Sequence, residues 1–293
     1  MKITIIGSNG QLGTDILETL SKNHDTIPLN HQDIEITDLS HCMRTLLSVK
    51  PDLVINTASF HNVPLCEEKK EEALRVNVLG PQNLAKACQS LNATLMHVST
   101  DYVFDGKKNS PYTEEDLPNP LSFYAISKLA GEHAVAAYCE KYKIIRVSGI
   151  YGKIPSRAKG SNFVSTMLSL AQEKKELQVV NDEFLTPTNT RDIGVQLESL
   201  LERPETGVFH ISNAGFCSWH EFAVAIFEIL EHKISVLPIP STHFPSKVKR
   251  PPYSVLENAR LKKLGIYQMR PWREALEYHL KSHSRGELGK QPP

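Results

Sequence analysis

The sequence predicts an α/β protein built on a doubly wound parallel sheet, with a smaller C-terminal lobe. Three observations lead to this prediction. The chain opens with a β-branched run, a glycine-rich turn and a helical pattern, and strands and helices then alternate through residue 147. After Gly152 the alternation gives way to longer loops and proline-rich segments. Because such alternation builds parallel sheets, we expect a Rossmann-type domain over residues 1–152 and mainly a substrate-binding lobe over 153–281.

Composition narrows the class of partner. The 293 residues are 40% hydrophobic, which is enough for a large core. Since 33 basic residues balance 33 acidic ones, we expect a small-molecule partner and neither nucleic acid nor a membrane. The five cysteines are scattered without Cys-x-x-Cys spacing, which argues against a disulfide framework or a metal site. With no signal region and no long apolar run, a cytoplasmic protein is expected.

The first strand, Ile3–Ile6, ends in a glycine-rich turn that leads into a helix. In such a turn one glycine allows the reversal, one lets the backbone approach a pyrophosphate, and one lets the helix pack on the strand. The helix N-terminus adds free N–H groups and a positive dipole. The pattern therefore predicts dinucleotide contacts, from Gly7, Asn9, Gly10, Gln11, Leu12 and Gly13.

The second strand, Thr26–Leu29, ends near the position where an acidic residue would bind the adenosine ribose 2′-OH. Asn30 and His31 stand there instead of a carboxylate. They would tolerate a 2′-phosphate, so NADPH is favoured over NADH as the cofactor. Two polar turn residues without any such role would look the same, which leaves both cofactors open.

The third unit brings two more candidate contacts to the same edge. Asp38 is placed to cap the next helix, and the buried strand over residues 51–58 ends at Ala58 and Ser59, where open α/β sheets bind ligands. A helix is expected from Glu67 to Leu91. Its charged start is interpreted as a solvated face, and its apolar positions are Leu74, Val78, Leu84 and Ala87.

Two segments then carry chemistry. The strand Leu95–Val98 ends in Ser99-Thr-Asp, which puts hydroxyl and carboxylate groups at the ligand edge, although a polar turn alone would explain them. Tyr124 and Lys128, four residues apart, share one face of the following helix. A cation beside a phenol lowers the phenol pKa, so the pair can act as an acid-base device. The strand Lys143–Val147 completes five strands of the predicted sheet.

After Gly152 the expected pieces are shorter. They are a basic loop over 153–160, an amphipathic helix over Asn162–Glu173, a strand over Leu177–Val180, a helix start at Thr190, a strand over Val208–Ile211, a capping box at Ser218–Glu221 opening a helix over Phe222–Leu230, a proline-punctuated irregular segment over 238–252, and a last helix near Trp272. Residues 190–212 are expected to return to the main sheet. Residues 282–293 lack an apolar period and are expected to be disordered.

With these motifs placed, the chain resembles the dTDP-4-dehydrorhamnose reductase family of extended short-chain dehydrogenases/reductases over about residues 1–280. The matching motifs are Gly7-x-x-Gly10-x-x-Gly13, Ser99-Thr-Asp-Tyr-Val-Phe-Asp-Gly106, Pro118-Asn-Pro-Leu121 with Tyr124-x-x-x-Lys128, Asn162-Phe163, Pro187-Thr188 and Arg250-Pro251. The resemblance implies hydride transfer from NADPH or NADH to the C4 ketone of dTDP-4-dehydro-L-rhamnose. The product would be dTDP-L-rhamnose, a precursor of bacterial surface polysaccharide.

The resemblance also implies roles for single residues. Tyr124 would be the general acid, Thr100 would donate a hydrogen bond to the same substrate oxygen, and Lys128 would hold the nicotinamide ribose and lower the tyrosine pKa. Glu35 and Ile36 would border the adenine, and Ala58, Ser59 and Lys128 would contact the cofactor. The substrate side would comprise Asp101, Tyr102, Gly149, Asn162, Leu185 and Arg250.

Some positions depart from the family pattern on the substrate side. Gly149 stands where Trp is common, Pro64 and Leu65 where Asp and Lys are common, and Leu185 where a small residue is common. A reductase or epimerase of another sugar nucleotide is therefore an alternative. A second alternative is a non-catalytic NADP-binding subunit resembling the methionine adenosyltransferase β-subunit. A homodimer is compatible with the resemblance, and no metal-ligand cluster is expected.

Overall fold

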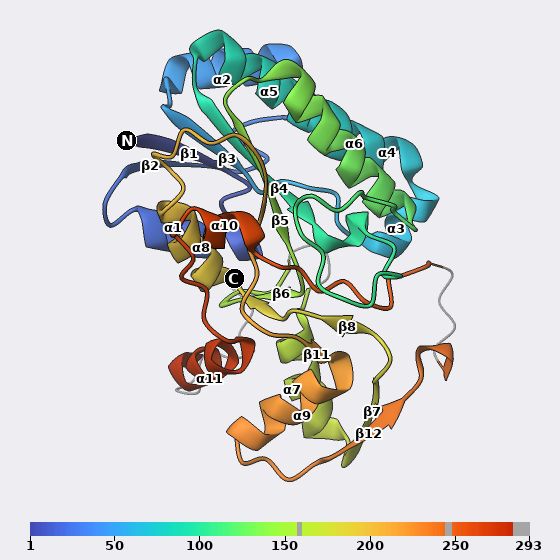
Figure 1. Ribbon diagram of the computed structural model, residues 1–293. Helices are drawn as coiled ribbons and strands as arrows, with labels where there is room; N and C mark the ends of the chain where they lie inside the picture. Colours follow the sequence, from blue (N-terminus) through green and yellow to red (C-terminus); the bar gives the residue numbers. More distant parts are fainter. Residues whose placement is uncertain (157–159, 244–247, 284–293) are drawn as a thin grey trace.

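The computed structural model describes residues 1–156, 160–243 and 248–283, and it is organised around one six-stranded parallel sheet (Figure 1). The strand order is β10-β5-β4-β3-β1-β2. This doubly wound order confirms the fold class predicted from the sequence. The strands are β1 (Lys2–Ile6), β2 (Asp25–Leu29), β3 (Leu53–Asn56), β4 (Thr94–Thr100), β5 (Tyr142–Val147) and β10 (Gly207–His210).

Helices cover both faces of this sheet, which explains why its central strands are apolar on both sides. On one face lie α2 (Leu39–Val49), α5 (Gly80–Leu91) and α6 (Phe123–Tyr138); on the other lie α1 (Gln11–Leu20) and α8 (Thr190–Glu198) (Figure 1). Each layer has its own buried cluster. Leu46, Leu84 and Val135 belong to the first, and Ile16, Ile193 and Leu197 to the second.

The predicted helix over Glu67–Leu91 is interrupted in the structure. It consists of α3 (Val63–Glu68), α4 (Lys70–Leu74), a π-helical turn over Arg75–Leu79, and α5. Ala73 and Asn77 are buried and share a helix face with Leu84, while Leu74 is 40% exposed. The expectation that Leu74 faces the core was therefore wrong, because the buried Ala73 and Asn77 occupy that face.

The buried Asn77 explains where the turn is anchored. Its Oδ1 accepts from the Phe60 backbone N–H at 2.8 Å. Its Nδ2 donates to the Phe60 carbonyl and to Ser127 Oγ, at 3.0 and 2.9 Å. The π turn therefore ties the loop after β3 to α6, the helix that carries Tyr124 and Lys128.

The remaining elements form the second lobe and the return to the sheet. β10 pairs in parallel with β5, Gly207 opposite Lys143. The other elements are β6 (Ile150–Tyr151), α7 (Phe163–Glu173), β7 (Glu176–Val180), β8 (Phe184–Leu185), β9 (Thr188–Asn189), β11 (Cys217–Ser218), α9 (Trp219–Ile229), β12 (Ser235–Ile239), α10 (Ala259–Lys263) and α11 (Trp272–His283). In Figure 1, α7, α9, β7 and β12 lie together beyond the sheet. The division at residue 152 stays a prediction.

Several C-terminal expectations need correction. The segment expected to be irregular begins inside β12, because the last two residues of that strand, Pro238 and Ile239, pair with β7; a two-stranded edge tolerates a proline. The helix start expected at Thr190 is, in contrast, confirmed by α8, whose N-cap Asn189 accepts from Arg191 N through its side chain. α11 extends to His283, so the tail predicted from residue 282 begins inside a helix. Three ranges lie outside the described part of the chain: residues 157–159 of the basic loop, 244–247 of the proline-rich segment, and 284–293 of the predicted tail. Within the described ranges, no helix is both long enough and apolar enough to cross a membrane.

Candidate active site

The glycine turn after β1 is shaped so that no side chain fits. Gly7 has a φ of +77°, and a Cβ there would lie 2.7 Å from Thr57 Oγ1; a Cβ on Gly13 would collide with the Gly7 carbonyl. Gly10 is the N-cap of α1 and brings no side chain to cap the first-turn N–H groups. These donors and the helix dipole suit the pyrophosphate of a dinucleotide. The residues present thus fit the expected cofactor.

The other residues of this turn that were predicted to contact the cofactor differ in how far their side chains are exposed. Leu12 is buried in the core, so its side chain is not offered to a ligand, and Asn9 is exposed. Gln11 Nε2 donates to the Ile150 carbonyl at 3.1 Å, while its Oε1 is buried without a hydrogen-bond partner. An unpartnered buried oxygen beside the turn is a free acceptor for a bound group.

At the expected adenosine end, the structure reveals a carboxylate that the sequence interpretation missed. The Asn30 backbone N–H donates to Asp33 Oδ2 at 2.8 Å, and Asn30 Oδ1 accepts from Gln32 N at 2.8 Å. The His31 and Glu35 side chains lie 3.6 Å apart on the surface. Asp33 escaped notice because it follows the expected position by three residues and returns to it through a turn.

The remaining predicted cofactor residues lie nearer the core. Ile36 is 6% exposed, and a Cβ on Gly80 would lie 2.6 Å from its Cδ1. Ala58 N donates to Asn56 Oδ1 at 3.1 Å at the carboxyl end of β3, and Ser59 follows, partly exposed. These positions border the same edge of the sheet as the glycine turn.

Tyr124 and Thr100 meet where α6 starts beside the end of β4. Ser122 caps this helix by accepting from Ala125 N, which fixes the first turn that carries Tyr124. Burial raises the pKa of Tyr124 above its ordinary value, and a side-chain hydrogen bond with Thr100 opposes that rise. This reverses the lowering expected from Lys128, because a phenolate loses its hydration here. A neutral phenol is a competent proton donor.

The Thr100 hydroxyl is committed to a buried carboxylate. It donates to Asp101 Oδ1 at 3.0 Å and accepts from Tyr102 N at 3.2 Å. A hydroxyl has one proton, so Thr100 acts toward Tyr124 as an acceptor in this arrangement. The expected donation from Thr100 to a substrate oxygen would therefore require the hydroxyl to break its hydrogen bond to Asp101.

Asp101 joins distant parts of the chain under the site. Its Oδ2 accepts from Ser148 Oγ at 2.8 Å and from Ser254 Oγ at 2.6 Å. Burial raises the pKa of Asp101 to about 6, against the opposing effect of these hydrogen bonds. Tyr102 packs its ring edge-on to Tyr124, with centroids 6.2 Å apart. Thr100, Tyr102, Tyr124 and the Asp101 carboxylate thus form one connected cluster.

Lys128 lies beneath this cluster, 2% exposed. Its Nζ donates to the Val98 carbonyl at 2.7 Å and lies 3.3 Å from His97 Nε2. Burial lowers the pKa of Lys128 to about 8, while the charge of Glu132 acts in the opposite direction. Glu132 is itself held in a buried pair, its Oε2 2.7 Å from Arg146 Nη2.

On the predicted substrate side, Gly149 and Leu185 are in contact. Gly149 has a φ of +50°, and Leu185, 3% exposed, occupies the adjoining space. Asn162 caps α7 by accepting from Ser165 N at 3.0 Å, so part of its amide has a structural role. Arg250 is exposed, and its positive charge acts on nearby Glu183.

Comparison with known proteins identifies the group to which this arrangement belongs. A family model described as the RmlD substrate binding domain matches residues 1–285. The chain belongs to the dTDP-4-dehydrorhamnose reductase family. The resemblance seen in the sequence is thereby confirmed.

Particular members of this family are close to the chain in sequence and structure. The spore coat polysaccharide biosynthesis protein SpsK of Bacillus subtilis is 37% identical, covering 97% of this chain and 98% of that protein. A dTDP-4-dehydrorhamnose reductase from Clostridium acetobutylicum superposes with a TM-score of 0.92 at 40% identity, over 97% of this chain and 100% of the other. The Bacillus anthracis reductase, solved in complex with NADP, also gives 0.92 at 36% identity, over 96% and 99%.

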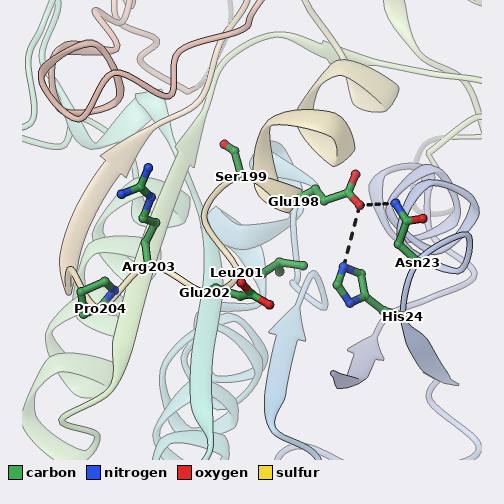
Figure 2. Close-up of a pocket in the computed structure, with 8 residues that line it drawn as sticks. All are labelled: Asn23, His24, Glu198, Ser199, Leu201, Glu202, Arg203 and Pro204. Carbon is green, nitrogen blue, oxygen red and sulfur yellow. Dashed lines mark hydrogen bonds and ion pairs between the residues drawn. The ribbon is translucent and has the colours of Figure 1, made fainter.

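A surface pocket lies at the opposite end of the sheet from the candidate active site. Figure 2 shows Glu198 beside Asn23 and His24, with Asn23 Nδ2 donating to Glu198 Oε1 at 2.6 Å. The lining residues precede β2 and β10, at the amino ends of the strands; they are Asn23, His24, Glu198, Ser199, Leu201, Glu202, Arg203 and Pro204. In the described part of the chain, no group of three or more His, Cys, Asp or Glu side chains could hold a metal ion.

Proposed function

We propose that this protein reduces the C4 ketone of a deoxysugar nucleotide, with dTDP-4-dehydro-L-rhamnose as the leading substrate and dTDP-L-rhamnose as the product. As a member of its family it is an NAD(P)-dependent oxidoreductase. The observation that carries the proposal is the placement of Tyr124 beside Thr100 at the carboxyl edge of the sheet, where the Thr100 side chain acts to lower the tyrosine pKa, with Lys128 below the pair. The same edge carries the glycine turn suited to a dinucleotide.

The chemistry assigns one task to each side chain. The reduced nicotinamide, when bound, supplies a hydride to the C4 carbon. Negative charge then grows on the carbonyl oxygen, and Tyr124 gives that oxygen its phenolic proton. Thr100 orients the phenol, while Asp101 fixes the Thr100 hydroxyl from behind. Lys128 would hold the nicotinamide ribose. These roles, and the further cofactor and substrate contacts predicted from the sequence, are part of the proposal.

Two sets of observations bear on which sugar is reduced: the names of the relatives and the Gly149–Leu185 contact. Several relatives are named as dTDP-4-dehydrorhamnose reductases, which favours the rhamnose precursor. SpsK is named for spore coat polysaccharide, which leaves room for another 4-keto-6-deoxy sugar. The Gly149–Leu185 contact on the predicted substrate side favours such a difference.

The decisive experiment follows NADPH or NADH oxidation by the purified full chain with a panel of 4-keto-6-deoxyhexoses linked to dTDP, UDP and GDP. Turnover on at least one sugar, lost in Tyr124→Phe, is the expected result. Interconversion of sugars without net cofactor oxidation would indicate an epimerase. Tight cofactor binding with no turnover on any sugar would indicate the non-catalytic subunit and refute the reductase.

A further inference from the structure

A buried histidine connects the end of β3 to Lys128. His97 lies in the middle of β4 and is 0% exposed, as is Asn56 beside it. Its Nδ1 lies 3.0 Å from Asn56 Nδ2, and its Nε2 lies 3.3 Å from Lys128 Nζ. Both ring nitrogens therefore face nitrogen atoms, which restricts where the imidazole proton can be.

The orientation of Asn56 settles the first contact. Asn56 Oδ1 accepts from the Ala58 backbone N–H at 3.1 Å, so the amide nitrogen is the atom that faces the ring. An amide nitrogen only donates, and Nδ1 of His97 must accept. Burial lowers the pKa of His97 well below its ordinary value, with the charge of Lys128 acting in the same direction. A neutral imidazole carries one proton, which is then on Nε2.

The second contact follows from the first. The Nε2–H of His97 points at Lys128 Nζ, and only an uncharged amine has a lone pair to accept it. An ammonium would meet that N–H with its own protons. The opposite tautomer would accept from an ammonium, but it would place Nδ1–H against the Asn56 amide and force that amide to give up Ala58 N–H. The charge on Lys128 is therefore coupled to Asn56.

We propose that His97 is a positioning residue: held by Asn56 as the Nε2–H tautomer, it donates to Lys128 Nζ and favours the amine form of that lysine. The consequence for cofactor affinity rests on the proposed function, in which Lys128 holds the nicotinamide ribose. Ala58 lies at the predicted cofactor edge. A ligand that breaks the hydrogen bond from Ala58 N–H to Asn56 would therefore affect the charge on Lys128, through Asn56 and His97.

The charged groups around Lys128 set the balance. Glu132, one helical turn further along α6, favours the ammonium, but it is shared with Arg146 of β5 and Ser99 of β4. From β4 only His97 and the Val98 carbonyl contact Nζ among the described hydrogen bonds. Burial brings the pKa of Lys128 to about 8, so its charge changes at a pH where the enzyme can be assayed.

The first test reads the tautomer directly. Full-length protein with ¹⁵N-labelled histidine is measured by long-range ¹H–¹⁵N spectroscopy at pH 9, above the pKa of about 8 at which Lys128 becomes the amine, and the His97 signals are identified by their loss in His97→Asn. The expected pattern is a protonated Nε2 and an unprotonated Nδ1. A protonated Nδ1, alone or together with Nε2, overturns the proposal whatever the cofactor titrations show.

The second test reads the charge on Lys128 through the NADPH dissociation constant between pH 6 and 10. Wild-type affinity should fall above a break near pH 8. Asn56→Asp keeps an oxygen for Ala58 N–H but requires Nδ1–H, which turns Nε2 into an acceptor for the ammonium. The break should rise by roughly one pH unit or more, a tenfold change in proton affinity.

Two further variants keep this second test decisive. His97→Asn preserves a partner for Asn56 but removes the donor to Lys128 Nζ. The pH at which NADPH affinity begins to fall should therefore also rise in this variant. It provides the test if Asn56→Asp fails to fold. His24→Asn, at the amino end of the strands, should leave the break unchanged. An unchanged break in both His97→Asn and Asn56→Asp refutes the proposal. Because binding is measured without a sugar, this failure is distinct from absence of reductase turnover.

Discussion

Leu185 Cδ1 lies 2.5 Å from the position that a Cβ atom on Gly149 would occupy. The two residues therefore share one volume, and the leucine fills what the glycine leaves empty. In the sequence, Gly149 and Leu185 are two separate departures from the family pattern, a small residue at one position and a large one at the other. The structure makes these departures from the family pattern a single complementary pair.

This contact predicts strong coupling between substitutions at the two positions. Gly149→Trp alone should destabilise the protein by about 1–3 kcal/mol, because the side chain meets Leu185 and the backbone keeps a φ of +50°. Adding Leu185→Gly should recover part of that loss, with a coupling of about 0.5–3 kcal/mol. Urea unfolding of both single variants and the double variant measures it; additive losses would contradict the shared volume. On dTDP-4-dehydro-L-rhamnose, the double variant should gain in kcat/KM relative to wild type.

Tyr124→Phe should lower turnover by about 10² or more while leaving NADPH affinity nearly unchanged, as expected when a general acid is lost. The phenyl ring can keep its edge contact with Tyr102, so the fold should be retained. Stopped-flow and steady-state rates on the confirmed substrate provide the measurement. Equal turnover in wild type and variant would remove Tyr124 from the proposed mechanism.

Asn30→Asp should shift cofactor preference toward NADH, because a carboxylate can bind the ribose 2′-OH and repels a 2′-phosphate. The substitution keeps the oxygen that accepts from Gln32 N, so the turn should persist. Dissociation constants for both cofactors are compared in wild type and variant. A wild-type preference for NADH would contradict the expected NADPH use and would point to Asp33, whose carboxylate already lies against Asn30.

Asp101 should make the stability of the protein depend on pH in an unusual direction. Its pKa is raised from 3.8 to about 6 by burial, so the folded state binds more protons than the unfolded state between these values. The free energy of unfolding should therefore fall as the pH rises through this window, by roughly 3 kcal/mol from this group, and stay level above it.

The measurement compares chemical unfolding of wild type and Asp101→Asn at pH 4 and pH 7.5. The variant lacks the titrating carboxyl. The free energy of unfolding of wild type, relative to that of the variant, should therefore be larger at pH 4 than at pH 7.5. For Asp105→Asn the same difference in the free energy of unfolding should change in the opposite sense. Hydrogen bonds, above all the one from the Lys107 backbone N–H, hold the pKa of Asp105 below its ordinary value. A pH-independent difference for Asp101→Asn would show that the pKa of Asp101 is the same in the folded and unfolded states, which contradicts the raised pKa.

The sequence by itself determined the features that depend on local patterns. Hydrophobic periodicity identified the parallel strands and most helices, and the glycine spacing marked the turn after β1. The four-residue spacing of Tyr124 and Lys128 put both on one helix face, and the motif around Thr100 led to the family. These inferences held because helix and strand periods are set by neighbouring residues.

Only the tertiary structure decided which hydrogen-bond partners those side chains have. The Thr100 hydroxyl donates a hydrogen bond to Asp101, and Asp101 is held by Ser148 and Ser254, which are 47 and 153 residues away from it in the chain. The tautomer of His97 depends on Asn56, 41 residues earlier. Partners so far apart leave no periodic trace, because a hydrogen bond responds to distance and angle in space. For the same reason the local pattern around Leu74 could not reveal the π turn that follows it, since that turn is anchored by the contacts of Asn77 with Phe60 and Ser127.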